Sequence, residues 1–492
     1  MPEDTDGLTD ISPELVAILP MNRLLFAFIA IIYIHCSCTE KKYVSGSGLH
    51  VIFSEDTIHF DTVFTTIGTV TREVRIINPY EGWLKINHIY LGNGDQSSFR
   101  LNIDGTPGNE SWNIELPPND SIFIFIDAII DPTNENSPVA ITDSIIVQID
   151  NSICDINLVA WGQDIHLINA AQIHTETWQN DKPYVVYNSM LVDTGYQLTI
   201  EKGTRVLFHR GSTMYIAGKL VVEGTVDEPV IFKSDRFEEI YSDIPGQWAG
   251  LYFINSSTEN KIDHAIIQNA VSGVHLGNLN SVDSPPDLKI SNSLIQHMSV
   301  TGISSLGAMI SANNCVISHC GFYCLFLAAG GEYDFSHCTI SNQWDYALRL
   351  SPSVAISDYI EYDKVVYSGL LLSAEFNNSV IYGPLASEVG LFPLVETNVL
   401  NCSFTSNLMK IDADNTIWSN YNLTNCIIGV DPDFINSADY DLRPDTLSPL
   451  LNVADIAIAD NFPYDIRSYS RFEDSGPDIG AYERQIGEIS EK

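Results

Sequence analysis

The chain has 492 residues, of which 45% are hydrophobic and 10% aromatic, so it can form packed cores in two or three domains. Lysine and arginine number 24 and aspartate and glutamate 63, which gives a formal net charge of −39. This charge repels nucleic acid and anionic lipid head groups, and a polyanionic sugar would need bridging cations such as Ca²⁺. Nucleic acid is therefore excluded as a partner.

Residues 21–38 have the layout of a bacterial export signal. A basic start, Met21-Asn22-Arg23, precedes the apolar run Leu24–Ile34, which is short for a membrane span. Ser37-Cys38 follows and resembles a lipobox, the motif whose cysteine is lipidated in bacterial lipoproteins. The resemblance implies lipid attachment at Cys38; a plain secretory signal and an uncleaved anchor are the alternatives. Residues 1–20 form an upstream extension, so Met21 competes with Met1 as initiator.

Residues 48–167 contain short alternating apolar and polar runs, such as Thr57–Phe64 and Ser121–Ile126. Turn signals, among them Asn78-Pro79 and Asp131-Pro132, separate these runs. Strands of this length and spacing predict an antiparallel β-sandwich of immunoglobulin-like type. The lack of a Cys-Trp-Cys pattern argues against a true immunoglobulin domain.

A seven-residue phrase then recurs within residues 168–430. Each copy starts with Asn or His, followed by a small residue and, two positions later, Ile or Phe. Most steps between copies are 22 to 28 residues, which predicts a solenoid of stacked coils, here a right-handed parallel β-helix. The copies begin at His264, Asn292, Asn314, His337, Asn378, Asn401 and Asn425.

The repeat assigns structural roles to several residues. The Asn and His heads should form a ladder of side chains at a corner of successive coils. Cysteines at the second position should form an inward-facing file, and they are Cys315, Cys338, Cys402 and Cys426. Gly218 and Gly224 fit corners that need positive φ. The 41-residue step from His337 to Asn378 predicts a hidden degenerate coil near 350–372.

Several segments resemble a family of Bacteroidota cell-envelope lipoproteins. They include Phe60–Thr69, Ser98–Gly105 and Ala160–Asp164. The resemblance implies a sandwich followed by a right-handed, pectate-lyase-like parallel β-helix, in an outer-membrane lipoprotein on the periplasmic or surface side. Residues 431–492, with Gly476-Pro477-Asp478-Ile479-Gly480-Ala481-Tyr482-Glu483, resemble the end of many secreted β-helix proteins. A solenoid end exposes unpaired strand edges, so this segment is predicted to cap it, with a sorting signal as the alternative.

No catalytic residue is assigned. A polysaccharide lyase of this fold needs Lys or Arg beside carboxylates that hold Ca²⁺, and no basic residue is seen to recur in register with an acidic cluster. A hydrolase needs paired carboxylates, and the polygalacturonase-type motifs are absent. Asp358, Glu361 and Asp363 fall in a predicted loop that either is solvated or lines a groove.

No metal site is assigned either. His297 and His319 occupy equivalent positions of consecutive repeats, but no third ligand is evident. Cys320 and Cys324 have poor spacing for zinc in a strand region. No cofactor is therefore expected, although the acidic composition leaves room for Ca²⁺.

Two functional classes remain open. The first is a non-catalytic β-helix that binds a glycan or an envelope protein, anchored to the membrane only by its lipid. Aromatic residues such as Trp248, Tyr252, Trp344 and Tyr346 could stack on sugar rings, or else pack in the core. The second class is a polysaccharide lyase or glycoside hydrolase.

Overall fold

The computed structural model describes residues 41–254, 257–279, 285–485 and 487. Residues 1–20, the predicted signal at 21–38 and the lipid site Cys38 lie outside them. The chain divides into two compact units, the first formed by the residues up to Ile58 with Thr71–Asp127 and Thr142–Leu158, and the second by the remainder. Within the described ranges, no helix combines the length and hydropathy of a membrane span.

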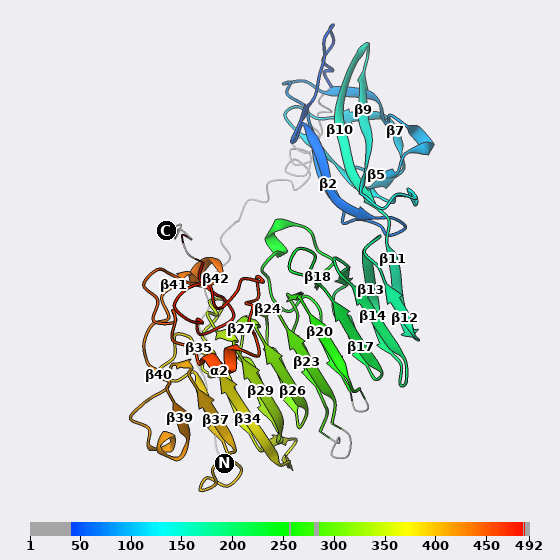
Figure 1. Ribbon diagram of the computed structural model, residues 1–492. Coiled ribbons are helices and arrows are strands. Elements are labelled where there is room, and N and C mark those ends of the chain that lie inside the picture. Colours follow the sequence, from blue (N-terminus) through cyan, green and yellow to red (C-terminus); the bar gives the residue numbers. More distant parts are fainter. Residues whose placement is uncertain (1–40, 255–256, 280–284, 486, 488–492) are drawn as a thin grey trace, which may run out of the picture. The chain divides into compact units, whose positions relative to one another are not determined.

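The first sheet-forming region contains two five-stranded sheets, with strand orders β1-β3-β8-β5-β6 and β2-β10-β9-β4-β7 (Figure 1). Neighbours such as β3 and β8, or β4 and β9, run antiparallel. Alternation of buried and exposed residues along β8 gives its sheet one apolar face. The immunoglobulin-like topology stays a prediction. The elements are β1 Ile52–Phe53, β2 Thr57–Phe64, β3 Arg72–Ile77, β4 Leu84–Leu91, η1 Gly94–Gln96, β5 Phe99–Ile103, β6 Thr106–Pro107, β7 Glu110–Leu116, β8 Ser121–Ala128, β9 Val139–Ile149 and β10 Ser152–Gln163.

The second unit is a parallel β-helix, which confirms the all-β solenoid. Each coil gives one strand to a ten-stranded sheet, called the narrow sheet, and two to an eighteen-stranded sheet, called the broad sheet. Every strand pairs in parallel with its counterpart one coil away, as β23 does with β26 and β24 with β27. The right-handed sense is the usual one for parallel crossovers and stays a prediction.

The narrow sheet consists of β12 Glu176–Trp178, β14 Gln197–Glu201, β17 Lys219–Glu223, β20 Asn260–Asp263, β23 Asp287–Ser291, β26 Met309–Asn313, β29 Gly331–Ser336, β34 Leu371–Asn377, β37 Cys402–Thr405 and β39 Asn422–Thr424. The broad sheet consists of β11 His166–Ile173, β13 Tyr184–Val192, β15 Arg205–Phe208, β16 Thr213–Ile216, β18 Val230–Ser234, β19 Gly250–Phe253, β21 Ala265–Gln268, β22 Ser272–Leu276, β24 Leu294–Met298, β25 Thr301–Leu306, β27 Val316–Cys320, β28 Tyr323–Ala328, β30 Thr339–Ser341, β31 Val354–Ser357, β35 Val380–Tyr382, β36 Val389–Phe392, β38 Leu408–Met409 and β40 Ile427–Ile428.

The interior of the coils is a continuous apolar stack. Phe335, Phe376 and Phe404 lie one above the other on consecutive narrow-sheet strands, with ring centroids 5.2 and 5.5 Å apart. Trp248 stacks on Phe208 at 4.0 Å and is fully buried. Because inward residues repeat at coil spacing, identical or similar side chains can stack as they do here.

The predicted corner ladder is present between the narrow sheet and the first broad-sheet strand of each coil. Its members have left-handed backbone, a conformation that Asn tolerates better than most residues. Asn314 donates to Asn292 at 3.0 Å, and Asn378 pairs with His337 at 3.0 Å. The positive-φ residues of this corner are His264, Asn292, Asn314, His337, Asn378, Ser406 and Asn425.

Two ladder predictions are wrong. Ser406 replaces Asn401 at the corner, and Cys402 lies on β37 opposite Ala374, so Cys402 does not belong to the file of Cys315 and Cys338. The Asn-Cys pair at 401–402 mimics the repeat locally, but the register follows Phe404, which must stack on Phe376. Asn407 takes the file position instead, where its side chain accepts from the Ser379 N–H at 2.7 Å.

The 41-residue step contains no extra coil, which corrects the prediction. β30, β31 and β34 pair with β27, β28 and β29 as a single coil. A loop over 342–353 and the antiparallel hairpin of β32 Tyr359–Tyr362 and β33 Val365–Ser368 enlarge it. Asp363 and Lys364 both have positive φ, as a tight hairpin turn requires.

Gly218 and Gly224 also differ from expectation, because neither has positive φ. Glycine is required at each position because the backbone of a neighbouring segment passes where a Cβ would lie. A Cβ on Gly218 would collide with the carbonyl oxygens of Asp193 and Tyr196, and one on Gly224 with that of His264.

The C-terminal segment lies along the side of the coils, which corrects the prediction that it caps their end. Leu450 and Ile479 pack against Val380 and Leu408 of the broad sheet. Gly480 and Asp455 donate backbone hydrogen bonds to Asn378 at 2.8 and 2.7 Å. The remaining elements are η2 Glu239–Tyr241, η3 Thr416–Asn420, β41 Phe434–Asn436, η4 Ser437–Asp439, β42 Asp441–Pro444 and α2 Ile456–Ala459.

Candidate functional site: a charged groove on the narrow sheet

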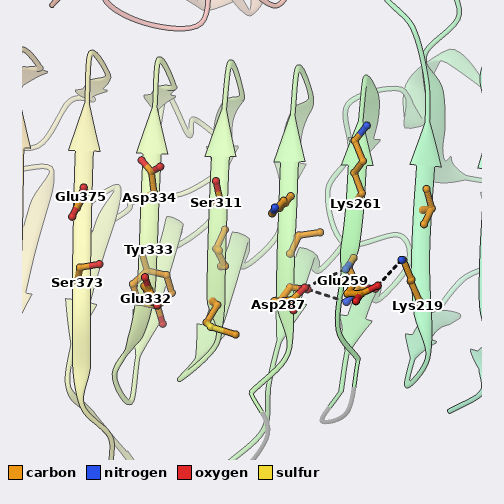
Figure 2. Close-up of a pocket in the computed structure, with 16 residues that line it drawn as sticks. Lys219, Glu259, Lys261, Asp287, Ser311, Glu332, Tyr333, Asp334, Ser373 and Glu375 are labelled. Carbon is orange, nitrogen blue, oxygen red and sulfur yellow. Dashed lines mark hydrogen bonds and ion pairs between the residues drawn. The ribbon is translucent and has the colours of Figure 1, made fainter. Parts of the chain in front are cut away.

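The outward face of the narrow sheet forms a groove of about 790 Å³. Two files of side chains cross its floor at right angles to the strands (Figure 2). The strand register fixes both files, since parallel neighbours bring equivalent residues within about 4.8 Å. The middle file is Lys261, Lys289, Ser311, Asp334 and Glu375, and the lower file is Lys219, Glu259, Asp287, Met309, Glu332 and Ser373.

Most charges at the β17–β23 end of the groove have partners. Lys219 binds Glu259 at 2.8 Å, which holds the pKa of this carboxyl below its ordinary value. Lys261 lies 3.3 Å from Asp263. The pKa of Asp263 is low because hydrogen bonds from His264, Asn292 and Ser291 together outweigh the opposing effect of burial. These carboxylates are therefore ionised throughout the physiological range.

Other charges in the groove lack an ionic partner. Three charged side chains have no ion pair and no side-chain hydrogen bond among the described residues: Lys289, Glu332 and Glu375. The Asp334 carboxylate accepts a hydrogen bond only from the Ser336 hydroxyl, at 2.9 Å. A groove with such charges can bind complementary charges on a ligand at fixed spacings.

Sequence reasoning missed this site. Two basic residues do recur in register, because Lys261 and Lys289 lie side by side on β20 and β23, with Asp263 and Asp287 nearby. No cluster of three or more acidic residues that could hold a metal ion accompanies them among the described residues. A signal was present. Each residue of the middle file stands three positions before a ladder head, as Lys261 does before His264 and Lys289 before Asn292.

The carboxyl groups with raised pKa lie outside this groove. Burial raises the pKa of Asp478 to about 6 and that of Glu483 to about 8, and it also raises that of Asp235. A glycosidase acid needs such a raised pKa beside the scissile bond.

The two histidines considered for metal binding do meet, at ring centroids 5.5 Å apart. Tyr440 lies edge-on to both, at 4.6 Å from His297 and 4.5 Å from His319. Burial lowers the pKa of both histidines, to about 3 for His319, and so favours their neutral forms. Asp243 is 4.0 Å from His297, and no set of three metal-ligating residues is found in the described ranges.

None of the other candidate residues lines the groove. Asp358 accepts a hydrogen bond from the Leu394 N–H at 2.7 Å, and Glu361 and Asp363 belong to the β32–β33 hairpin. Trp248 is a core residue, with its indole N–H donated to the Gln268 carbonyl at 2.7 Å. Tyr252 lies on the broad sheet, between Tyr215 and His275. Trp344 and Tyr346 pack together in the 342–353 loop.

The cysteines are free thiols in the described part of the chain. Cys320 and Cys324 lie side by side in the core, fully buried, and burial raises the pKa of Cys324. Cys315 and Cys338 adjoin each other in the same way. Buried thiols with raised pKa are poor nucleophiles and poor metal ligands, which fits a packing role.

Comparison with known proteins agrees with the fold. Residues 171–289 match the family described as pectate-lyase like beta helix domain. No curated protein matches the chain.

Among solved structures, a family 123 glycoside hydrolase from Clostridium perfringens is similar at 11% identity and a TM-score of 0.17, over 24% of this chain and 26% of that one. The chain thus spans about a quarter of that enzyme's length. The ASH / PapD-like domain of human CEP192 is similar at 12% identity and a TM-score of 0.17, over 26% of this chain and 96% of that domain. Scores this low do not define a shared fold.

Proposed function

We propose that the protein is a lipid-anchored cell-envelope protein whose β-helix binds a glycan along the narrow-sheet groove without cleaving it. The observation that carries the proposal is the middle file, in which charged side chains stand at coil spacing along the floor of a groove of about 790 Å³. A groove that runs along the coils suits an extended polymer better than a compact metabolite. The match of residues 171–289 to a pectate-lyase-like domain supports a carbohydrate ligand.

The same proposal places the chain in the envelope. Cys38 would carry the lipid, so that the mature protein faces the periplasm or the cell surface from the outer membrane. The two antiparallel sheets of residues 48–167 would form an immunoglobulin-like spacer or docking module between anchor and coils. A Cys38→Ala chain should lose radioactive fatty-acid labelling; unchanged labelling would disprove the anchor.

The binding proposal is tested with the full chain, purified in detergent. A glycan array should give binding that falls in Lys289→Gln and is unchanged in Glu223→Gln, which removes a charge from the same sheet outside the groove. An array and a pull-down of envelope proteins that are both blank would refute it. Capture of an envelope protein through the same residues would assign the groove to a protein partner instead.

A catalytic alternative rests on one observation, the lysines in register with carboxylates. Lys261 and Lys289 could serve as the base of a lyase, with neighbouring carboxylates as cation ligands. Incubation with a polysaccharide panel would then release reducing ends or an unsaturated, ultraviolet-absorbing product. Absence of both products, with and without Ca²⁺, would leave binding as the function.

A further inference from the structure

The middle file of the groove has an ordered charge sequence along the solenoid axis. Lys261 and Lys289 stand on consecutive strands, Ser311 is a neutral gap, and then Asp334 and Glu375 stand on the next two strands. Figure 2 shows Lys261, Ser311, Asp334 and Glu375 at one level across the sheet. The middle file is thus cationic at one end and anionic at the other, in a chain with a formal net charge of −39.

The two ends of the file are too far apart to neutralise each other. Lys289 and Asp334 are separated by two coil steps, about 10 Å at roughly 4.8 Å per step, which exceeds the Debye length of about 8 Å in physiological salt. Lys261 and Glu375 are separated by four steps, or about 19 Å. The fold therefore holds opposite charges at a fixed separation.

Part of the positive charge is already offset by neighbouring carboxylates. Lys261 is paired with Asp263 at 3.3 Å and Glu259 with Lys219 at 2.8 Å, and Asp287 of the lower file precedes Lys289 by two residues on β23. Near Asp334, the exposed Glu332 of the lower file adds further negative charge. Neither Lys289 nor Glu375 has a charged partner among the described residues. A ligand can therefore supply the missing partners at both ends of the file.

We infer that the groove selects a zwitterionic glycan, one that carries an anionic group such as a carboxylate and a cationic group such as an amine. This inference rests on the proposed glycan binding and specifies its ligand. The anionic group lies over Lys261 and Lys289 and the cationic group over Asp334 and Glu375, about 10 to 19 Å away. The order of charges also sets the direction in which the chain lies along the groove.

The sharpest test uses probes that differ only in charge and length. They are β-1,4-linked glucose chains of two to six sugars, oxidised to glucuronate at the non-reducing end and carrying an amine at the reducing end. The matched controls are the N-acetylated form, which keeps only the carboxylate, the methyl ester, which keeps only the amine, and the doubly blocked form. Affinities for the full chain are measured by calorimetry at low and at physiological salt.

The zwitterionic probe should bind more tightly than either singly charged form, by about two- to fivefold per charge, with an optimum at lengths that place the charges 10 to 19 Å apart. The preference should weaken in high salt. Equal binding of all four forms would overturn the inference but leave glycan binding intact. No binding of any form, together with a blank glycan array, would overturn both.

Substitutions on the outward face of the narrow sheet complete the test. Lys289→Gln should remove the preference for the carboxylate, and Glu375→Gln the preference for the amine. The double variant Lys289→Asp with Asp334→Lys keeps the net charge and scrambles the order, so it should lose the zwitterionic preference. Glu223→Gln, outside the groove, should retain it. A zwitterionic preference that survives the double variant would place the recognition elsewhere.

Discussion

Asn378 joins the corner ladder to the C-terminal segment, and replacing it with Ala perturbs both. Its side chain donates to the Asp455 carbonyl at 3.0 Å, accepts from the Asp455 N–H at 2.7 Å, and pairs with His337 Nε2 at 3.0 Å. The residue is fully buried and has a φ of 47°. Asn378→Ala therefore removes three hydrogen bonds and keeps a Cβ in left-handed backbone.

The expected loss follows from these contacts. Three buried hydrogen bonds contribute about 0.5 to 1.5 kcal/mol each, and Ala in left-handed backbone costs about 1 to 2 kcal/mol. The substitution would also leave His337 Nε2 without the hydrogen bond to Asn378, and His337 Nδ1 already lacks a partner among the described residues. Together these contributions predict a loss of about 3 to 6 kcal/mol in the free energy of opening this contact. Asn378→Gly loses the same hydrogen bonds without the backbone strain, so it should be about 1 kcal/mol less damaging.

Hydrogen exchange of Asp455 and the adjoining helix α2 gives the opening free energy of this contact. Asn292→Ala is the matched control, since Asn292 occupies the same corner but donates to Asp263 at 2.9 Å. It should leave exchange in α2 unchanged. A loss below 0.5 kcal/mol in Asn378→Ala, or Gly more damaging than Ala, would refute the reasoning.

Three other predictions concern stability. Burial raises the pKa of Asp478 to about 6 and that of Glu483 to about 8, from 3.8 and 4.5, so the folded state binds more protons in between. The free energy of local unfolding of the C-terminal segment should therefore fall by on the order of a few kcal/mol between pH 5 and pH 8.5. Amide hydrogen exchange, corrected for the intrinsic exchange rate at each pH, measures this fall, and protection that increases with pH would contradict it. Arg349→Met should cost about 3 to 5 kcal/mol in urea unfolding, because it leaves the fully buried Glu388 carboxylate, 2.7 Å from the guanidinium, without a cation, and a loss below 1 kcal/mol would show that the pair is dispensable. Gly218→Ala should lower stability by about 2 kcal/mol or more through backbone collision, whereas Gly68→Ala, with its nearest atom at 3.8 Å, should be close to neutral.

The repeat predicted the coils well because one physical requirement recurs in each of them. A corner in left-handed backbone favours Asn and a few other residues, and the demand appears in sequence as Asn292, Asn314, Asn378 and Asn425. The same reading failed at Asn401, where a local match competed with the register of Phe404 inside the stack. The number of coils in the 41-residue step could not be predicted either, because a hairpin and a degenerate coil have similar apolar patterns in sequence.

The groove was harder to predict because its residues share position and not chemistry. Lys261 and Lys289 are 28 positions apart, and Asp334 and Glu375 are 41 apart, since loops of different length separate them. In the sequence, the feature that these residues share is their position three residues before a ladder head, which gives them equivalent places in successive coils. Outward residues are under no packing constraint, so they vary from coil to coil and carry no repeat of their own.

The lateral position of the C-terminal segment has a consequence for the order of folding. Residues 431–485 follow the coils in the chain, yet they cover a strip of apolar side chains that the coils present much earlier, including Leu294, Val316, Val380 and Leu408. Until this segment emerges and docks, that strip is open to water and to other unfolded chains. A chain interrupted before residue 431 would keep the strip exposed, so proteases and chaperones could tell truncated coils from finished ones.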